Sequence, residues 1–366
     1  MNGALSLRPR GIWLVMSLEL RQRIRSKRWY IALGVWTVIL AGMGAIVLAA
    51  ASMVATDVSS VRVAAAAMFS LLAIMVLMAM LVVLPALSAG AINGDRTAGT
   101  LATLQATLLS PLEIVLGKLL AGWMTGLAFL ALALPSLLPT ALLGGISPFY
   151  LLRVLAMIAA LALCVTAIGL GLSSVTNRQL GSVVLTYVLV AVVTGMLPAV
   201  WLSSAAFLQQ EKEVTIWTEE YDHRADITET GWAPRFCMKQ REKRTVIRLD
   251  VSQPLIWGNP VVMLADVSPR LSNDSATGQM ADDAPDLLRL LSFGVRYATS
   301  PMHPSNFNYC ADDTPGAPRD LGEPSSIPRW PLGLMMWVSA GGGAFATAVW
   351  RLSVPIKRLG KGTRIA

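Results

Sequence analysis

Residues 30–54 read YIALGVWTVILAGMGAIVLAAASMV and contain no charged side chain. About 20 consecutive apolar residues are enough for an α-helix to cross the hydrocarbon core of a membrane, so this stretch predicts a transmembrane helix. Five further apolar stretches follow, at about residues 63–92, 119–143, 151–175, 182–207 and 331–350. The sequence therefore predicts an all-α polytopic membrane protein with six transmembrane helices, the first five within residues 30–207.

The composition of the whole chain agrees with this prediction. Of 366 residues, 54% are hydrophobic and 14% are charged, whereas about 25% of the residues of a typical soluble domain are charged. The mean hydropathy is +0.58. So few charged side chains could not cover the surface of a water-soluble fold. The composition thus excludes an ordinary soluble enzyme.

Charged side chains are divided unevenly between the two sides of this predicted membrane protein. The net charge is +8, and Lys and Arg are concentrated in residues 1–29, in the tail 351–366 and in the loops on the same side. Residues 208–330, on the other side, contain more acidic than basic residues. Because an excess of Lys and Arg marks cytoplasmic segments, we expect both termini to be cytoplasmic, in a cell inner membrane or plasma membrane. The basic charge then indicates contact with membrane lipid and requires no nucleic acid.

Residues 10–28 predict an amphipathic helix before the first span. Ile12, Met16, Leu20 and Ile24 recur four residues apart, while arginines occupy or border another face. This pattern is typical of a helix on the cytoplasmic membrane surface. Two interpretations fit this helix equally: a basic anchor that sets the membrane topology, and a helix that binds a partner protein.

The loop between the second and third spans, residues 93–118, reads NGDRTAGTLATLQATLLSPLEIVLGK. Its first three residues predict a turn where the chain leaves the membrane. Residues 97–107 predict a short helix, because Leu101, Leu104 and Leu108 recur at helical spacing. A short helix attached to two spans is suited to transmitting force from a docked protein.

The end of the same loop predicts the start of the third transmembrane helix. Ser110 is followed directly by Pro111 and, three residues on, by Glu113. Serine at the N-cap and glutamate at the third helical position form a capping box, and proline suits the first helical position. We therefore expect this helix to begin in the cytoplasm, ahead of its apolar stretch.

This loop resembles that of the integral membrane subunit of type-2 ABC exporters, which have six spans per subunit and a separate ATPase chain. The matching residues are Asp95-Arg96, Gly99-Thr100-Leu101, Ser110-Pro111-Leu112-Glu113-Ile114 and Gly117-Lys118. The resemblance implies that the loop holds a coupling helix seated in a cleft of the ATPase. The docking and transmission residues it implies are Asp95, Arg96, Thr100, Leu101, Leu104 and Glu113. Two positions depart from the family pattern: Ala102 stands where glutamate is usual, and Leu108 where proline is frequent.

The chain lacks the nucleotide-binding loop of an ATPase, which has the form G-x-x-x-x-G-K-[ST]. The nearest fragment, GKGT at residues 360–363, has no first glycine and has glycine after the lysine. We therefore expect no cofactor and no catalysis in this chain, with ATP and Mg²⁺ bound by a partner. The six apolar stretches contain no Asp, Glu, His or Lys, so a proton or ion relay is disfavoured.

Small residues in the spans predict close helix contacts. Residues 339–344 of the sixth span read SAGGGA, and the fourth span contains Gly169 and Gly171. Such residues let helices approach closely in lipid, either within one subunit or at a sliding or subunit contact. Gly195 and Pro198 predict a bend in the fifth span.

Residues 208–330 predict a small extracytoplasmic α+β domain between the fifth and sixth helices. Alternation predicts strands at 213–221 and 245–251, and helical patterns occur at 260–267 and 284–299. Cys237 and Cys310 are the only two cysteines on the oxidising side of the membrane, so we expect a disulfide between them. The third cysteine, Cys164, is expected to pack within the fourth span. The spacing of the cysteines and histidines matches no zinc pattern, and we expect no metal.

Together, these expectations predict that the chain is a permease subunit of an ATP-driven exporter. It would pair with a copy of itself or a relative, bind two ATPase subunits, and move an amphipathic or lipid-like substrate, such as a drug, lipid or peptide, outward. Two alternatives stay open. One is a non-transporting, ATPase-linked signalling subunit that acts on an envelope protein, and the other is a receptor-like structural membrane protein.

Overall fold

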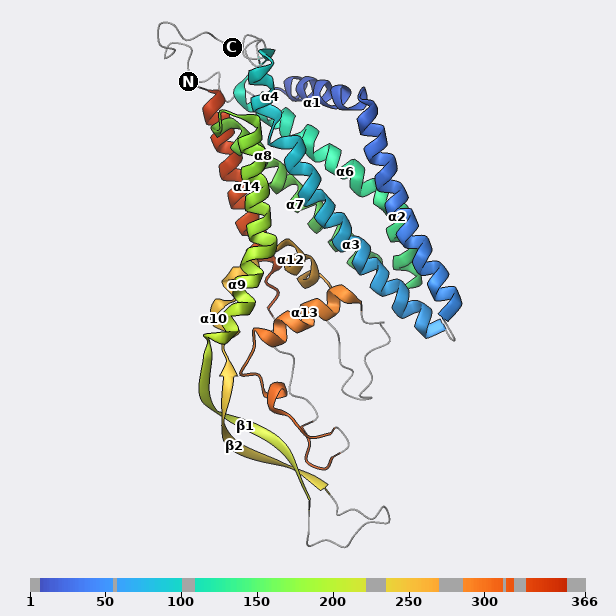
Figure 1. The fold of residues 1–366 in the computed structure, drawn as a ribbon, viewed down its shortest axis with the longest axis vertical. Coiled ribbons are helices and arrows are strands. Elements are labelled where there is room, and N and C mark those ends of the chain that lie inside the picture. The colour runs from blue at the N-terminus through green and yellow to red at the C-terminus, as the bar shows by residue number, and fades with distance from the viewer. Residues whose placement is uncertain are drawn as a thin grey trace.

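Six helical segments long and apolar enough to span a membrane form the body of the molecule, as the sequence predicts. In this computed structural model, residues 7–54, 58–100, 109–221, 235–269, 286–311, 314–318 and 327–353 are described. The spanning segments are α2 (Lys27–Val54), α3 (Val58–Ser88), α6 (Pro111–Leu143), α7 (Pro148–Val175), the composite α8–α9 (Gln179–Ala191 and Leu197–Ser203) and α14 (Trp330–Leu352). Helices α8 and α14 run nearly along the long axis of the molecule, and α2, α3, α6 and α7 are inclined to it (Figure 1).

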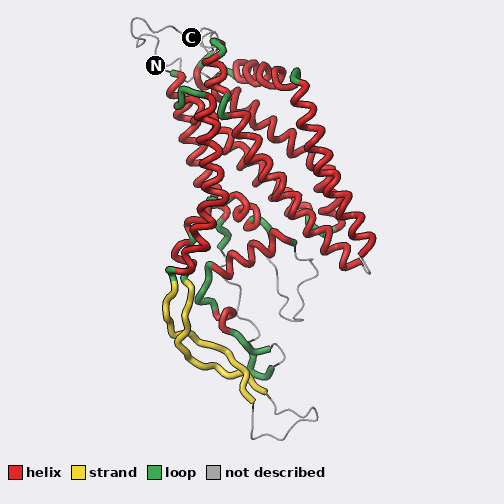
Figure 2. The backbone as a smooth tube through the Cα atoms, viewed as in Figure 1, coloured by secondary structure: helices red, strands yellow, loops and turns green. Residues whose placement is uncertain are grey.

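The two ends of this bundle carry different structures. Helix α1 (Pro9–Ile24) crosses one end, where the short helix α4 (Ala91–Thr97) also lies. We call this the α4 end. The opposite end carries the two-stranded ribbon of β1 (Gln209–Tyr221) and β2 (Arg235–Ile247), and we call it the hairpin end (Figure 2).

The core of the bundle lies among α3, α6 and α7. Phe69, Leu72 and Leu77 of α3 are fully buried there, as are Ile158 and Leu161 of α7. Each such side chain contributes about 1.5–3 kcal/mol when it leaves water. Within lipid the same close packing supplies dispersion contacts between the helices.

Small residues bring α14 directly against α7. A Cβ added at Gly171 would lie 2.5 Å from the Cβ of Ala344, and one at Gly341 would lie 3.3 Å from the Cα of Cys164. Part of the predicted small-residue stretch therefore packs within the subunit. Gly342 and Gly343 have nothing within 4 Å of such a Cβ and face outward.

The fifth span is interrupted, as its glycine and proline predicted. A π-helical turn (Val192–Met196) separates α8 from α9, and Pro198 lies in the first turn of α9. The N–H of Leu197 donates to the carbonyl of Val192 in the π-helical turn rather than to that of Val193, and Pro198 has no N–H to donate to the carbonyl of Thr194. The buried side-chain amide of Asn259 donates to the carbonyls of Val193 and Thr194, at 3.2 and 3.0 Å.

The ribbon differs from its predicted bounds. Strand β1 contains the predicted stretch, but β2 begins at Arg235 rather than at Thr245, and residues 249–251 belong to the short helix α10 (Leu249–Ser252). The strands are antiparallel with Gln209 opposite Ile247. The many charged side chains of β2 obscure its alternation in the sequence. The predicted disulfide between Cys237 and Cys310 is present, with a Cα–Cα distance of 5.9 Å.

Two predicted helices of the same region pack onto the spans. These are α12 (Pro260–Asp266) and α13 (Leu287–Ala298), which follow the short helix α11 (Pro254–Trp257). Met263, Leu264 and Leu288 belong to the same buried cluster as the core of the bundle. The buried carboxylate of Asp286 accepts hydrogen bonds from Ser70 of α3 and Tyr150 of α7, at 2.8 and 3.1 Å. The unit at the hairpin end is therefore anchored in the bundle, and the ribbon projects from it.

Candidate functional site

The site predicted from the sequence centres on α4, a helix of seven residues that follows a turn at Ala89 and Gly90. The expected turn at residues 93–95 is wrong, because these residues are helical and the chain turns before them. The expected helix start at residue 97 is also wrong, because α4 ends at Thr97 and Gly99 turns the chain with a φ of 71°. Thr100 is helical again, and residues 101–108, with Leu101 and Leu104, lie outside the described residues.

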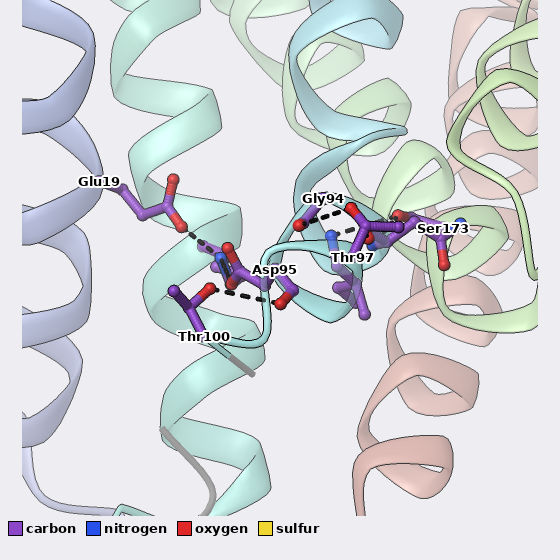
Figure 3. Close-up of polar contacts among 9 residues, drawn as sticks. Glu19, Gly94, Asp95, Thr97, Thr100 and Ser173 are labelled. Atoms are coloured by element: carbon purple, nitrogen blue, oxygen red, sulfur yellow. Dashed lines mark hydrogen bonds and ion pairs between the residues drawn. The ribbon is translucent and has the colours of Figure 1, made fainter. Parts of the chain in front are cut away.

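The first turn of α4 is capped by a neighbouring helix. Gly90, at the N-cap, has no side chain to accept the free N–H groups. The hydroxyl oxygen of Ser173, on α7, accepts instead from the N–H of Ile92 at 3.2 Å and of Asn93 at 3.1 Å (Figure 3). This arrangement fixes the start of α4 to the end of α7.

Asn93 joins α4 to two spans. It is fully buried, and its side-chain amide donates to the hydroxyl oxygen of Thr176 at 2.9 Å, just beyond α7, and to that of Ser182, on α8, at 3.5 Å. The Ser182 hydroxyl in turn donates to the carbonyl of Ala89 at 2.5 Å. A buried amide without partners would cost about 1–3 kcal/mol, so these contacts hold α4 in one position against α7 and α8.

Lys118 of α6 joins α4 to α1. Its side chain is 1% exposed, and its Nζ lies 2.6 Å from the Oδ2 of Asp95 and also contacts the carboxylate of Glu19, on α1 (Figure 3). A buried ammonium is stable only with such partners. Helix α6 begins at Pro111, so the third span contains buried Glu113 and Lys118. Both residues precede the apolar stretch 119–143, which contains no Glu or Lys, and they lie in the part of α6 expected to begin ahead of that stretch.

Close packing supports the contact between α1 and α6. A Cβ at Gly117 would lie 2.6 Å from the Cβ of Val15, so only glycine lets the two helices approach this closely. The face of α1 around Gly11 and Val15 is buried, whereas Trp13 is 63% exposed. Helix α1 thus lies on α6 with bulky apolar side chains directed away from it.

Glu113 lies where α6 begins, next to the start of α1. The predicted capping box is confirmed: Ser110 accepts from the N–H of Glu113 at 3.2 Å, and Glu113 accepts from that of Ser110 at 2.9 Å. The other carboxylate oxygen of Glu113 accepts from the N–H of Arg8 at 2.7 Å, and the side chain is fully buried. Glu113 therefore fixes the start of α1 to the start of α6 and offers no surface to a partner.

Of the other predicted residues, Asp95 and Arg96 lie on α4, and Thr100 lies three residues beyond its end. Arg96 donates to the side chain of Asn93 at 3.2 Å and to the carbonyl of Thr176 at 3.5 Å. Thr100 is exposed and donates to the carbonyl of Asp95 at 3.3 Å. Asp95 and Arg96 thus belong to the contacts that position α4, while Thr100 lies at its surface.

Sequence reasoning missed most of the supporting contacts. Glu19, Asn93, Ser173 and Ser182 were not singled out for this site, and Lys118 appeared only within a motif. The signal available in the sequence was Lys118 itself, because a lysine next to an apolar stretch needs an acidic partner when it is buried. Lys118 and Glu19 are 99 residues apart in the chain. The sequence therefore did not identify Glu19 as that partner.

The apolar helices and the linked α4 end define a polytopic membrane protein whose spans meet at one short helix. A model of the ABC-2 family transporter proteins matches residues 13–291, which is most of the chain. The chain belongs to this family, and it is a membrane-spanning permease subunit of an ABC transporter. Family members typically work with a separate ABC ATPase subunit. No curated protein matches the chain.

Proposed function

We propose that this chain is the membrane subunit of an ATP-driven exporter, in which an ATPase subunit docks at the α4 end and drives an amphipathic or lipid-like substrate outward. The observation that carries this proposal is the set of buried contacts around α4. Ser173, Asn93 and Lys118 connect this helix to α7, α8, α6 and α1. A displacement of α4 is therefore transmitted to four neighbouring helices at once.

The charge distribution supports a cytoplasmic position for the α4 end. Helix α1 contains Arg10, Arg21 and Arg23, and α4 contains Arg96. Cytoplasmic segments carry this kind of excess. The Cys237–Cys310 disulfide lies at the hairpin end, which fits an oxidising compartment on the other side. Both termini are then cytoplasmic.

The residues at the α4 end have separate roles in this proposal. Thr100, with Leu101 and Leu104, forms the surface that contacts the ATPase. Asp95, Arg96 and Glu113 transmit the movement, because they connect α4, α7, α6 and α1 rather than facing a partner. The ATPase binds ATP and Mg²⁺, and this chain supplies no catalytic residue.

The complete transporter contains two permease subunits and two ATPase subunits. Helices α2 and α8 leave large apolar side chains exposed, including Val38 at 71% and Leu180 at 76%. In a membrane such faces contact lipid or a second permease chain. A homodimer and a heterodimer both satisfy this requirement.

Co-purification and transport together test the proposal. The full chain, tagged and isolated from its native membranes, is expected to recover an ATPase with a nucleotide-binding loop. In vesicles that contain the complex, ATP is expected to drive lipid analogues out of the leaflet facing the ATPase. Thr100→Tyr should reduce hydrolysis stimulated by these analogues, whereas Thr218→Tyr, at the hairpin end, should not. Recovery of no ATPase, or of an ATPase without ATP-driven movement, would refute the exporter.

A further inference from the structure

A cavity of about 640 Å³ lies among α7, α14, α13 and the end of α12. Figure 1 shows α12 and α13 toward the hairpin end of the molecule. Pockets that bind small molecules have volumes of about 300–1,000 Å³. The cavity is far along the bundle from α4, so it is separate from the candidate coupling site. Its size is sufficient for the head group and upper chain of an amphiphile.

The walls of this cavity are largely apolar. Arg153, Ala156, Met157 and Ala160 line it from one face of α7, at positions i, i+3, i+4 and i+7. Leu334 lines it from α14. Ala156 is exposed on the surface of a spanning helix, so an apolar chain can extend from the cavity along α7.

Asp266 supplies the one carboxylate among the described residues of the cavity wall, and this carboxylate is already engaged. Its Oδ1 lies 2.7 Å from the Nη2 of Arg296. Its Oδ2 accepts from the backbone N–H groups of Arg329 and Trp330 at 2.6 and 2.9 Å, where α14 begins. Asp266 therefore holds α14 and α13 together and has little capacity for another cation.

Arg296 keeps donors that the described part of the protein does not satisfy. Its Nε and Nη1 are buried, and among the described residues neither has a hydrogen-bond partner. Each buried donor left unsatisfied costs about 1–3 kcal/mol. Arg296 lines the cavity, so a rotation of its guanidinium toward the cavity would let an acceptor oxygen of a ligand satisfy these donors.

A second guanidinium group borders the same cavity. Arg153 is exposed, and its Cζ lies 4.1 Å from the centroid of the Phe149 ring. Within the described ranges it forms no ion pair with an acidic side chain. Among the described residues that line the cavity there are thus two arginines and a single, engaged carboxylate, so this part of the wall is net positive.

We propose that this cavity binds an amphiphile with an anionic phosphate or carboxylate head group, held by Arg153 and Arg296, and with its acyl chain along α7 and Leu334. Guanidinium groups pair with these oxyanions through two parallel hydrogen bonds. The inference rests on the proposed export function and narrows its substrate class from lipid-like compounds to anionic amphiphiles that leave through the hairpin end.

Photolabelling of the full chain in nanodiscs of zwitterionic lipid tests the inference. The probe is lysophosphatidic acid with a diazirine in its acyl chain, and a monoacylglycerol with the same chain is the uncharged control. We expect adducts on α7 and α14 from the charged probe. Arg153→Gln and Arg296→Gln should each reduce their yield about tenfold, the loss of one charge-assisted hydrogen bond. Arg62→Gln, an arginine of α3 outside the cavity wall, should leave the yield unchanged.

Three outcomes would overturn the inference. These are equal labelling by the monoacylglycerol, full labelling of Arg153→Gln, and displacement of the probe by inorganic phosphate as efficiently as by unlabelled lysophosphatidic acid. Ala160→Phe, which fills the cavity without removing a charge, should also abolish labelling. This variant tests the inference even if Arg296→Gln fails to fold. The labelling needs neither ATP nor an ATPase. A negative labelling result would therefore not contradict the proposed exporter, and a negative transport assay would not contradict binding in the cavity.

Discussion

The Nζ of Lys118 on α6 lies 2.6 Å from the Oδ2 of Asp95 on α4. With Glu19 of α1 as its second partner, this nearly inaccessible lysine joins three helices at one point. Hydrogen bonds from α4 to α7 and α8 complete the arrangement. In the proposed function, the α4 end is the joint through which a docked ATPase moves the bundle.

Replacement of Lys118 by methionine should destabilise the joint. It leaves the partly exposed carboxylates of Asp95 and Glu19 close together without a cation, and loss of one partner of a buried pair costs about 3–5 kcal/mol. The melting temperature of the purified chain in detergent is expected to fall, and the triple variant with Asp95→Asn and Glu19→Gln should regain part of it. Arg244→Met breaks an exposed pair with Glu242 and should cost at most about 1 kcal/mol. Equal effects of the two replacements would disprove the role of Lys118.

Ser173→Ala should uncouple ATP hydrolysis from transport while α7 stays folded. It removes the acceptor of two N–H groups at the start of α4, which costs about 0.5–2 kcal/mol, as for other lost caps. The ratio of substrate transported to ATP hydrolysed is expected to fall. Ser203→Ala is the control, because Ser203 donates only to a carbonyl of its own helix. A normal ratio in Ser173→Ala would show that this cap has no part in coupling.

Gly117→Ala should separate α1 from α6. The added methyl group would lie 2.6 Å from the Cβ of Val15, which is too close for two carbon atoms. A fluorescence distance between α1 and α6 is expected to increase, and Val15→Gly in the same chain should restore it. Gly342→Ala adds a methyl group where nothing lies within 4 Å and should leave the distance unchanged. An unchanged distance in Gly117→Ala would contradict this packing.

Asn259→Leu should destabilise the kink in the fifth span. It removes the side-chain amide that donates to the carbonyls of Val193 and Thr194, at about 1–3 kcal/mol for each carbonyl. It also removes the side-chain oxygen that caps the first turn of α12. The melting temperature should fall, and Pro198→Ala should restore part of it by returning a helical N–H. If the double variant is less stable than Asn259→Leu alone, the explanation is wrong.

Acidification should make the Cys237–Cys310 disulfide at the hairpin end more accessible to a reductant. Glu219 accepts from Thr314 and Ala311 at 2.6 and 2.8 Å, next to Cys310. These hydrogen bonds, with the charge of Arg235, lower the pKa of Glu219. A group with a lowered pKa stabilises the fold above its ordinary pKa of about 4.3 and loses this effect as pH falls through the lowered value.

The rate at which a water-soluble phosphine reduces the Cys237–Cys310 disulfide measures this effect. We expect reduction to accelerate as the pH falls below about 4, the range in which Glu219 becomes protonated. Glu219→Gln should be reduced quickly at every pH, and Glu242→Gln should behave as the native chain. A pH profile that persists in Glu219→Gln would assign the effect to another group.

Local patterns in the sequence were enough to predict the six spans, the capping box of Ser110 and Glu113, and the disulfide. Each depends on a run of residues, on a spacing of three, or on there being a single pair of cysteines in one compartment. The contacts of Lys118 with Glu19 and of Asn93 with Ser182 join residues far apart in the chain and depend on how the helices pack. The same limit hid the insertion of α12 and α13 into the bundle, because an amphipathic helix does not specify the surface that it covers.

Photocrosslinking from the α4 end tests the central claim most directly. Benzoylphenylalanine in place of exposed Ala98, next to α4, is predicted to form an adduct with the ATPase subunit in native membranes. The same residue in place of exposed Val251, at the hairpin end, is predicted to form none. An ATPase adduct from residue 251, or its absence from residue 98 in a complex that still transports, would contradict docking at the α4 end.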